Sequence, residues 1–222
     1  TSILSGLQSG NTYYIRAYAT NVQGTEYGQQ IILDNLTLPF TVKDIDGNDY
    51  SIIKFGNQFW LGENLKVTKY NDGIVIPIVQ DNTAWANLST GAYCWYNNDL
   101  QTGNFYGSLY NFYTVNTNKI CPTGWHVPSS AEWNALNDFL KINDYGLTEC
   151  ANYIGKVVAA KVSWSSWDSQ YTVGYQPETN NISGFSGLAA GVRSTNGFSD
   201  KGKTTLWWST TLNNDNVWVT SL

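Results

Sequence analysis

Charged side chains are scarce in this 222-residue chain: Asp, Glu, Lys and Arg together make up only 13% of it, about half of the share in typical soluble domains. The formal net charge is −5, and the sequence contains no basic cluster. Because nucleic acids and anionic membrane surfaces are bound through clustered Lys and Arg, we expect neither as a partner. No run of about 18 apolar residues occurs, so we also expect no membrane span in this chain.

Methionine is missing from the chain, and histidine occurs once. The Met count is zero, which leads us to expect a mature or trimmed segment of a longer exported protein. The only histidine, His126, has no second histidine with which to hold zinc or build a catalytic triad. It follows Cys121 by five residues, but strand geometry would separate the two side chains by about 16 Å. We therefore interpret His126 as a hydrogen-bonded core residue.

Cysteine is also rare, with three in the chain: Cys94, Cys121 and Cys150. If any two of them form a disulfide, the third stays unpaired. The opposite interpretation, three buried free thiols, is equally compatible with the sequence.

Aromatic residues are abundant instead, with 10 Trp and 15 Tyr. They can fill a large core, or they can lie at the surface and pack against sugars or proteins. Trp164 and Trp167 fall in an expected loop, and as an exposed pair they would stack on a carbohydrate face. The alternative is that they cover the core beneath that loop.

Residues 1–35 show the pattern of two strands. A turn at residues 9–11 is followed by alternation over residues 13–18, and Gly24 to Leu33 would form a second strand. The pattern resembles the C-terminal part of a fibronectin type III domain. Since about two strands of a seven-stranded sandwich cannot form a core alone, we expect them to pair with the following domain, with another chain or with the rest of their own domain.

After a linker at residues 36–39, the main domain runs over residues 40–222. It opens with a β meander over residues 42–65, with turns at 46–48 and 56–57. Further on, Ser129 and Glu132 form a capping box, and the apolar spacing after it predicts a helix over 129–141. The oxygen-rich segment 44–49 is interpreted as a hairpin turn and not as an EF-hand loop, because Gly47 stands at its fourth position and not its sixth.

Several blocks of this domain carry a family resemblance, namely residues 42–65, 92–98, 106–113, 121–133, 183–193 and 207–211. In that order they resemble the Fibrobacter succinogenes major paralogous domain. The resemblance implies a C-type-lectin-like or formylglycine-generating-enzyme-like fold. We therefore expect an α+β domain with two helices, near 107–116 and 129–141, packed on short irregular antiparallel strands. Long loops are expected over 66–92 and 142–182, and the C-terminal strand of the family is expected to be missing after Leu222.

The same resemblance bears on the cysteines. In that family a cysteine at the position of Cys121 is often matched by one near the end of the domain, which this chain does not reach. It therefore implies that Cys121 has lost its partner, and that Cys94 and Cys150 pair with each other.

Two further segments suggest a calcium-dependent sugar site. Gln176-Pro177-Glu178 is similar to the Gln-Pro-acid tripeptide of calcium-dependent lectins, and residues 213–218 are loosely similar to their second ligand segment. Calcium would take oxygen ligands and bridge to sugar hydroxyls. The candidate calcium ligands are Glu178, Asn180 and Asp215, and the candidate sugar contacts are Trp164, Trp167, Gln176, Glu178, Asn214 and Trp218. A loop turn and a polar hairpin would explain the same residues without a metal.

On this evidence the chain is expected to be a non-catalytic binding or adhesion module of a secreted or lipid-anchored bacterial surface protein. Carbohydrate is the first expected ligand and a surface protein the second. A structural subunit of a surface fibre, assembled by strand pairing through residues 1–35, is the alternative. A formylglycine-generating-type enzyme is the third, and it is disfavoured because such enzymes use a cysteine pair in the C-terminal half, whereas no cysteine follows Cys150.

Overall fold

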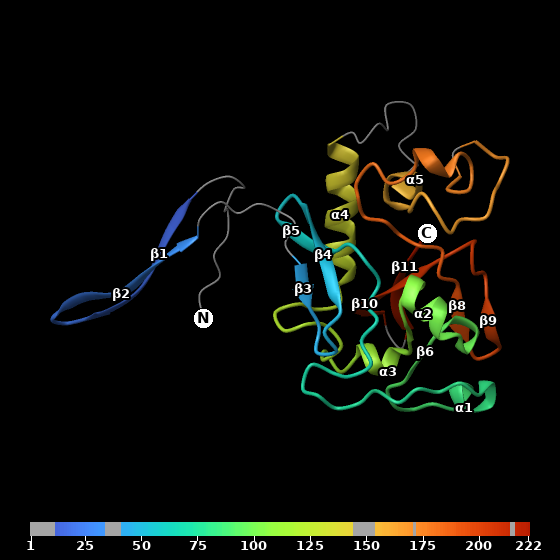
Figure 1. Ribbon diagram of the computed structural model, residues 1–222, viewed down its shortest axis with the longest axis horizontal. Coiled ribbons are helices and arrows are strands. Elements are labelled where there is room, and N and C mark those ends of the chain that lie inside the picture. The colour runs from blue at the N-terminus through green and yellow to red at the C-terminus, as the bar shows by residue number, and fades with distance from the viewer. Residues whose placement is uncertain (1–11, 34–40, 144–153, 171, 214–215) are drawn as a thin grey trace. The chain divides into compact units, whose positions relative to one another are not determined.

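The computed structural model describes residues 12–33, 41–143, 154–170, 172–213 and 216–222 (Figure 1). The chain forms two compact units, Thr1–Phe40 and Thr41–Leu222, called here the N-terminal and the C-terminal unit. Within the described residues, no helix is long and apolar enough to cross a bilayer.

The N-terminal unit contains one antiparallel hairpin. Strands β1 (Tyr13–Asn21) and β2 (Gly24–Leu33) pair from Tyr13 opposite Leu33 to the turn at residues 22–23, with an irregularity between Arg16 and Tyr18. The predicted strand over residues 24–33 is confirmed. No described side chain of this hairpin is buried, and both faces expose large apolar side chains, among them Tyr14, Tyr18, Tyr27, Ile31 and Ile32.

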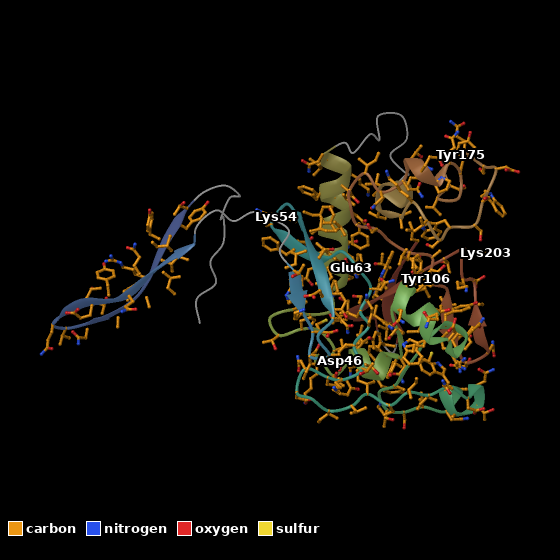
Figure 2. The ribbon with its side chains drawn as sticks, viewed as in Figure 1. Asp46, Lys54, Glu63, Tyr106, Tyr175 and Lys203 are labelled. Atoms are coloured by element: carbon orange, nitrogen blue, oxygen red, sulfur yellow. The ribbon has the colours of Figure 1, made fainter. Side chains whose placement is uncertain are left out.

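The C-terminal unit opens with the predicted meander. Strands β3 (Thr41–Lys43), β4 (Asp49–Phe55) and β5 (Gln58–Leu61) form one antiparallel sheet in the order β3-β4-β5. The turn between β3 and β4 is organised by the buried Asp44, whose carboxylate accepts hydrogen bonds from the Asn48 backbone N–H at 2.9 Å and the Tyr50 hydroxyl at 2.7 Å. Asp46 forms an ion pair with Lys69 (Figure 2). These carboxylates hold a turn, as predicted.

The remaining strands form three separate two-stranded sheets. Each pair is antiparallel, and they are β6 (Tyr93–Cys94) with β7 (Leu109–Tyr110), β8 (Val192–Ser194) with β9 (Gly197–Ser199), and β10 (Leu206–Asn213) with β11 (Asn216–Ser221). Short, separate sheets are what the sequence analysis expected for this unit.

Helices complete an α+β architecture, as predicted. They are α1 (Asn82–Ala86), α2 (Leu100–Tyr106), α3 (Phe112–Val115), α4 (Ser130–Ile142) and α5 (Ile154–Val158), with short 3-10 turns at Tyr96–Asn98 and Pro177–Thr179. The predicted α4 is confirmed, including its capping box between Ser129 and Glu132. Helices α1 and α5 lie where the sequence analysis expected loops.

The predicted helix over 107–116 is confirmed only over Phe112–Val115, where α3 lies, and is wrong for its first half. Gly107 ends α2 with a φ of 87°, and a Cβ at this position would lie 2.6 Å from the Cβ of Asn64. The chain then extends through β7, and Asn111 caps the single turn of α3 by accepting from the Thr114 N–H. Only a glycine fits this close approach, so the helix cannot continue through it.

The main hydrophobic core lies between α4, the β4–β5 hairpin, α5 and the segment that contains Phe185. Its buried members are Phe55, Trp60, Trp133, Leu136, Leu140, Val157, Val158 and Phe185. The Trp60 and Trp133 rings are 4.7 Å apart, and the Trp133 indole N–H donates to the Trp208 carbonyl oxygen at 3.4 Å. Glu132 therefore helps to cap α4, and the neighbouring Trp133 anchors the helix in the core.

Candidate ligand-binding pocket

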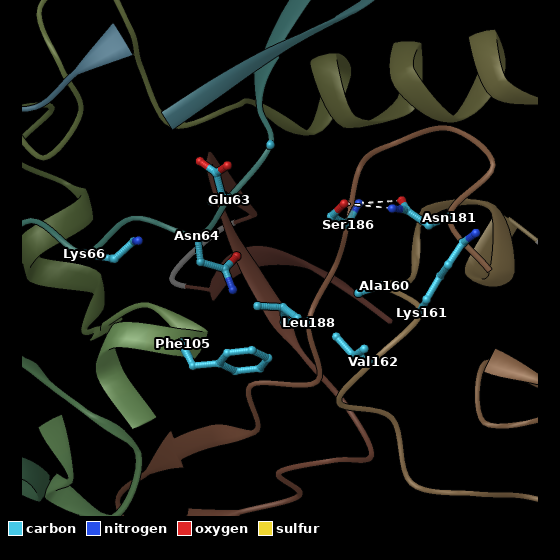
Figure 3. Close-up of a pocket in the computed structure, with 11 residues that line it drawn as sticks. Glu63, Asn64, Lys66, Phe105, Ala160, Lys161, Val162, Asn181, Ser186 and Leu188 are labelled. Atoms are coloured by element: carbon cyan, nitrogen blue, oxygen red, sulfur yellow. Dashed lines mark hydrogen bonds between the residues drawn. The ribbon is translucent and has the colours of Figure 1, made fainter. Parts of the chain in front are cut away.

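An open pocket with a volume of about 330 Å³ lies in the C-terminal unit (Figure 3). Four separate segments line it: residues 62–66 after β5, Phe105 of α2, residues 160–162 after α5, and residues 181–188. Its volume is near the lower end of the range of about 300–1,000 Å³ that is usual for small-molecule sites.

The wall formed by residues 62–66 is rigid. The Gly62 N–H donates to the Ser51 carbonyl oxygen at 2.8 Å, and a Cβ on Gly62 would come within 2.3 Å of the Ser51 hydroxyl. The Asn64 amide donates to the Tyr106 carbonyl oxygen at 2.8 Å and accepts from the Trp207 indole N–H at 3.0 Å. Asn64 therefore joins this wall to α2 and to β10.

The opposite wall is held by its own hydrogen bonds. Asn181 adopts a left-handed backbone, and its side chain accepts from the Ser186 N–H at 2.7 Å and donates to the Ser186 hydroxyl at 2.8 Å. The Ala160 N–H donates to the Gly187 carbonyl oxygen at 2.8 Å. Both walls are thus formed before any ligand arrives, which reduces the entropic cost of binding.

Apolar side chains occupy the middle of the pocket. Phe105 is 54% exposed although it is a large aromatic residue. In Figure 3 its ring extends from α2 toward Leu188 and Val162, which reach in from the other side. Its edge packs against Tyr106, with ring centroids 4.8 Å apart. A concave site with an accessible aromatic ring is suited to packing against the apolar face of a small ligand.

Three charged side chains stand at the rim. Glu63 accepts from the Ser51 N–H at 3.0 Å and from the Ser51 hydroxyl at 2.9 Å, so both of its oxygens are engaged. Lys66 and Lys161 lie on opposite sides in Figure 3. Among the described residues, neither lysine has an ion-pair partner.

The pocket offers packing, hydrogen bonds and positive charge to a ligand. The ionisable residues among those that line it are Glu63, Lys66 and Lys161. Acid–base catalysis would require two groups that converge on one reacting atom, whereas Glu63 is held by Ser51 and the lysines stand apart.

The predicted tryptophan pair is divided by the fold. Trp164 is only 7% exposed, and its indole N–H donates to the Gly187 carbonyl oxygen at 3.1 Å, so the expectation that it contacts a ligand is wrong. It packs against the buried Ala159 and Ala189. Trp167 is 64% exposed, and Trp218 is also exposed on β11, but neither lines the pocket.

The predicted calcium ligands are not brought together where the structure describes them. Glu178 is exposed in the 3-10 turn, while Asn180 is 1% exposed and donates inward to the Ala160 and Val173 carbonyl oxygens. Asn214 and Asp215 lie outside the described residues. The described part of the chain contains no group of three or more His, Cys, Asp or Glu side chains positioned to hold a metal ion.

Lys156 binds the loop in which a calcium site was expected. The Lys156 ammonium donates to the carbonyl oxygens of Thr172, Tyr175 and Gln176. Partial burial lowers the pKa of Lys156, while the charge of Glu178 acts in the opposite direction. Because the Lys156 ammonium already occupies these carbonyl oxygens, we interpret Gln176 as a turn residue and not as part of a calcium site.

His126 is not a core residue, contrary to our interpretation. Its side chain is 66% exposed, and its Nε2 lies 2.8 Å from the Oε1 of Glu132. The chain leaves Cys121 through a proline turn and not through an extended strand, which places His126 at the start of α4.

Cys94 and Cys121 are buried free thiols. Burial raises the pKa of each to about 12, which keeps both protonated and unreactive. The implied Cys94–Cys150 disulfide is thus not supported at Cys94, which packs against Trp85 and Ala92, and Cys150 lies outside the described residues.

The residues that form the pocket were missed by sequence reasoning. Phe105, Lys161 and Leu188 come from three separate segments, and no local motif links them. Gly107 offers a local signal only for the end of α2, because glycine is common where a helix stops.

The C-terminal unit is thus an α+β domain that contains a pocket of a size suited to a small molecule. Comparison with known families identifies it further. The model of the Fibrobacter succinogenes major domain matches residues 53–222, so the chain belongs to this family. Neither the curated proteins nor the solved structures with which the chain was compared gave a match.

Proposed function

We propose that the chain is a non-catalytic binding module of an exported bacterial surface protein, and that its C-terminal unit binds carbohydrate in the pocket around Phe105. The observation that carries this proposal is the exposed Phe105 ring inside a preformed, polar-walled pocket. A sugar ring has an apolar C–H face that packs on an aromatic ring and hydroxyl groups that bond to amides, hydroxyls and carboxylates.

The size of the pocket favours the end of a saccharide chain over a long internal stretch. The uncharged polar side chains that line the pocket are Asn64, Asn181 and Ser186. We further propose a C-type-lectin-like architecture for this unit and a fibronectin type III origin for the hairpin. Both rest on the sequence resemblance and on the mixture of helices and small antiparallel sheets.

The test is a glycan array followed by calorimetric titration of the full 222-residue chain, with wild type, Phe105→Ala and Phe59→Ala compared. Phe59 on β5 is 56% exposed and lies outside the pocket, so it is a matched control for Phe105. We expect a saccharide ligand whose affinity falls at least about tenfold in Phe105→Ala and is unchanged in Phe59→Ala. Equal binding by wild type and Phe105→Ala, or no glycan ligand at all, contradicts the proposal.

The same titration is repeated with calcium and with a chelator. Because Lys156 already gathers the loop oxygens, we expect the affinity to be the same in both. Binding abolished by the chelator would move the site to the loop that carries Glu178.

A structural role in a surface fibre is the second candidate, and the exposed hairpin β1–β2 favours it. A two-stranded hairpin alone is marginally stable in water, and this one exposes Tyr18 and Ile31 on its faces and unpaired edges along both strands. Strand addition by a neighbouring chain would cover them. Light scattering after gel filtration tests this: assembly that grows with concentration and is lost in Ile31→Lys supports the role, and a monomer at all concentrations contradicts it.

A further inference from the structure

We infer that the ligand of the pocket is an acidic saccharide, whose carboxylate or sulfate group is bound by Lys66 and Lys161. This inference rests on the proposed carbohydrate-binding function and names the class of sugar. It comes from the charges around the pocket, which differ from those of the chain as a whole.

Most cationic side chains of the described residues are already engaged. Eight of the 12 are engaged: Arg16 with Gln30, Lys43 with Asp49, Lys54 with Phe59, Lys69 with Asp46, Lys119 with Asp72, Lys156 with three carbonyl oxygens, Arg193 with two aromatic rings, and Lys201 with Tyr96 and Tyr106. Among the described residues the four without such a partner are Lys66, Lys141, Lys161 and Lys203, and two of these four, Lys66 and Lys161, line the pocket. The pocket of a chain with a formal net charge of −5 therefore carries two ammonium groups that no acidic side chain neutralises.

The one acidic residue in the lining does not neutralise these lysines. Both oxygens of Glu63 accept hydrogen bonds from Ser51 on β4. No ion pair joins Glu63 to either lysine. The pocket thus presents two cations to one anion, and that anion is held to the wall.

The positions of the apolar side chains and of the two lysines determine which part of a ligand would contact the positive charge. Phe105, Leu188 and Val162 lie at the centre, and Lys66 and Lys161 line opposite sides, with the Lys161 side chain extending away from Phe105 (Figure 3). A sugar ring on Phe105 would therefore carry its acidic substituent outward to an ammonium. A lysine ammonium is a compact positive charge on a flexible stem, so it can bind a carboxylate or a sulfate group.

An acidic peptide would also be attracted by two lysines, but the pocket favours the saccharide. Its centre offers one accessible aromatic ring within about 330 Å³, and its walls carry side-chain amides and a hydroxyl. A peptide would instead use an open sheet edge or an extended groove.

The test is calorimetric titration of the full chain with an oligogalacturonate, with its neutral methyl ester and with a sulfated oligosaccharide. The comparison of acid and ester changes the charge while it keeps the sugar. Because each exposed charge pair contributes modestly, we expect each lysine to supply about a threefold to fivefold gain in affinity. The acidic form should therefore bind about tenfold tighter than the ester at low salt, and the difference should shrink as salt screens the charges.

Lys66→Gln/Lys161→Gln should lower the affinity for the acidic sugar to that of its ester. The control is Lys203→Gln, which removes the charge of an exposed lysine that does not line the pocket (Figure 2). It should leave the affinity unchanged. Preference for the sulfated sugar with the same loss in the double variant would support the inference with sulfate as the bound group.

Failure of this inference is distinguishable from failure of the proposed function. If acid and ester bind equally and the double variant binds both as well as wild type does, the acidic class is wrong and carbohydrate binding stands. If no saccharide binds but poly-glutamate does, the carbohydrate assignment itself is overturned.

Discussion

At the scale of single residues, Arg193 holds distant parts of the C-terminal unit together. Its guanidinium lies 4.0 Å from the Phe198 ring centroid and 5.3 Å from that of Trp85. Its Nη2 donates to the Gln80 carbonyl oxygen at 3.2 Å, whereas its buried Nε and Nη1 have no hydrogen-bond partner. The guanidinium lies over both rings, so this side chain links α1 to the β8–β9 hairpin.

Arg193→Lys should destabilise the protein by about 1–3 kcal/mol, because an ammonium cannot stack flat on aromatic rings and donate to a carbonyl oxygen at once. Urea unfolding followed by tryptophan fluorescence measures this. Arg16→Lys, at an exposed position on β1, is the control and should be nearly neutral. An unchanged midpoint for Arg193→Lys would show that the stacking contributes nothing.

Glu132 links stability to pH. Partial burial acts to raise its pKa, but hydrogen bonds from the Ser129 N–H and from His126 outweigh burial, and the pKa is lowered. A carboxyl with a depressed pKa in the folded state stabilises the protein above its unfolded pKa of about 4.3, and this stabilisation is lost as pH falls through the folded pKa.

We therefore expect wild type to melt at a higher temperature than Glu132→Gln at pH 6, and the gap to close as the pH is lowered toward 3. Thermal melts at a series of pH values test this. The His126→Ala variant should keep part of this stabilisation by Glu132 at pH 6, since the hydrogen bonds between Glu132 and Ser129 remain. A gap that is the same at pH 3 and pH 6 would contradict a role for the ionised carboxylate.

At the scale of elements, Gly103 inside α2 is an exception to the usual preference for alanine over glycine in helices. Alanine is normally better than glycine in a helix by about 1 kcal/mol. A Cβ on Gly103, however, would come within 2.0 Å of the Trp95 ring. The helix and the aromatic side chain are in direct contact because glycine leaves room.

Gly103→Ala should consequently destabilise the protein by about 1–3 kcal/mol through overpacking. It should also reduce saccharide binding, because α2 carries Phe105. Asn104→Ala at the neighbouring exposed position is the control, and it is expected to be neutral or slightly stabilising. Stabilisation by Gly103→Ala would mean that Trp95 moves aside without cost.

The long segment after α5 depends on Lys156. Replacing it by Met would leave the Thr172, Tyr175 and Gln176 carbonyl oxygens without their donor, at a cost of about 1–3 kcal/mol. We expect faster proteolysis within residues 160–182, detected by mass spectrometry. Lys161→Met on the same segment should behave like wild type in this assay. Rescue of Lys156→Met by calcium but not by magnesium would instead indicate a latent metal site.

At the scale of the whole molecule, all described buried side chains belong to the C-terminal unit. A protein comprising residues 41–222 should therefore unfold with the same denaturant midpoint as the full chain, measured by tryptophan fluorescence. The hairpin peptide 12–33 should be largely unstructured by circular dichroism in water. A midpoint lowered by removal of residues 1–40 would show that the C-terminal unit needs the hairpin.

Local signals in the sequence determined several elements. The Ser129–Glu132 box and the apolar spacing after it predict α4, because capping and amphipathicity involve residues within one helix. The Gly56-Asn57 turn predicts the β4–β5 hairpin for the same reason. The family, too, could be identified from sequence blocks, and the match over residues 53–222 confirms it.

Tertiary structure alone decided which of these residues line a site. Trp164 and Trp167 stand three residues apart in one motif, yet the first is buried and the second is exposed. The difference arises because Trp164 packs in a cluster with the nearby Ala159 and with Ala189 and Leu222 from later in the chain, whereas Trp167 does not belong to that cluster. The pocket around Phe105 likewise exists because four segments meet. Its composition depends on long-range packing, for which the sequence carries no local pattern.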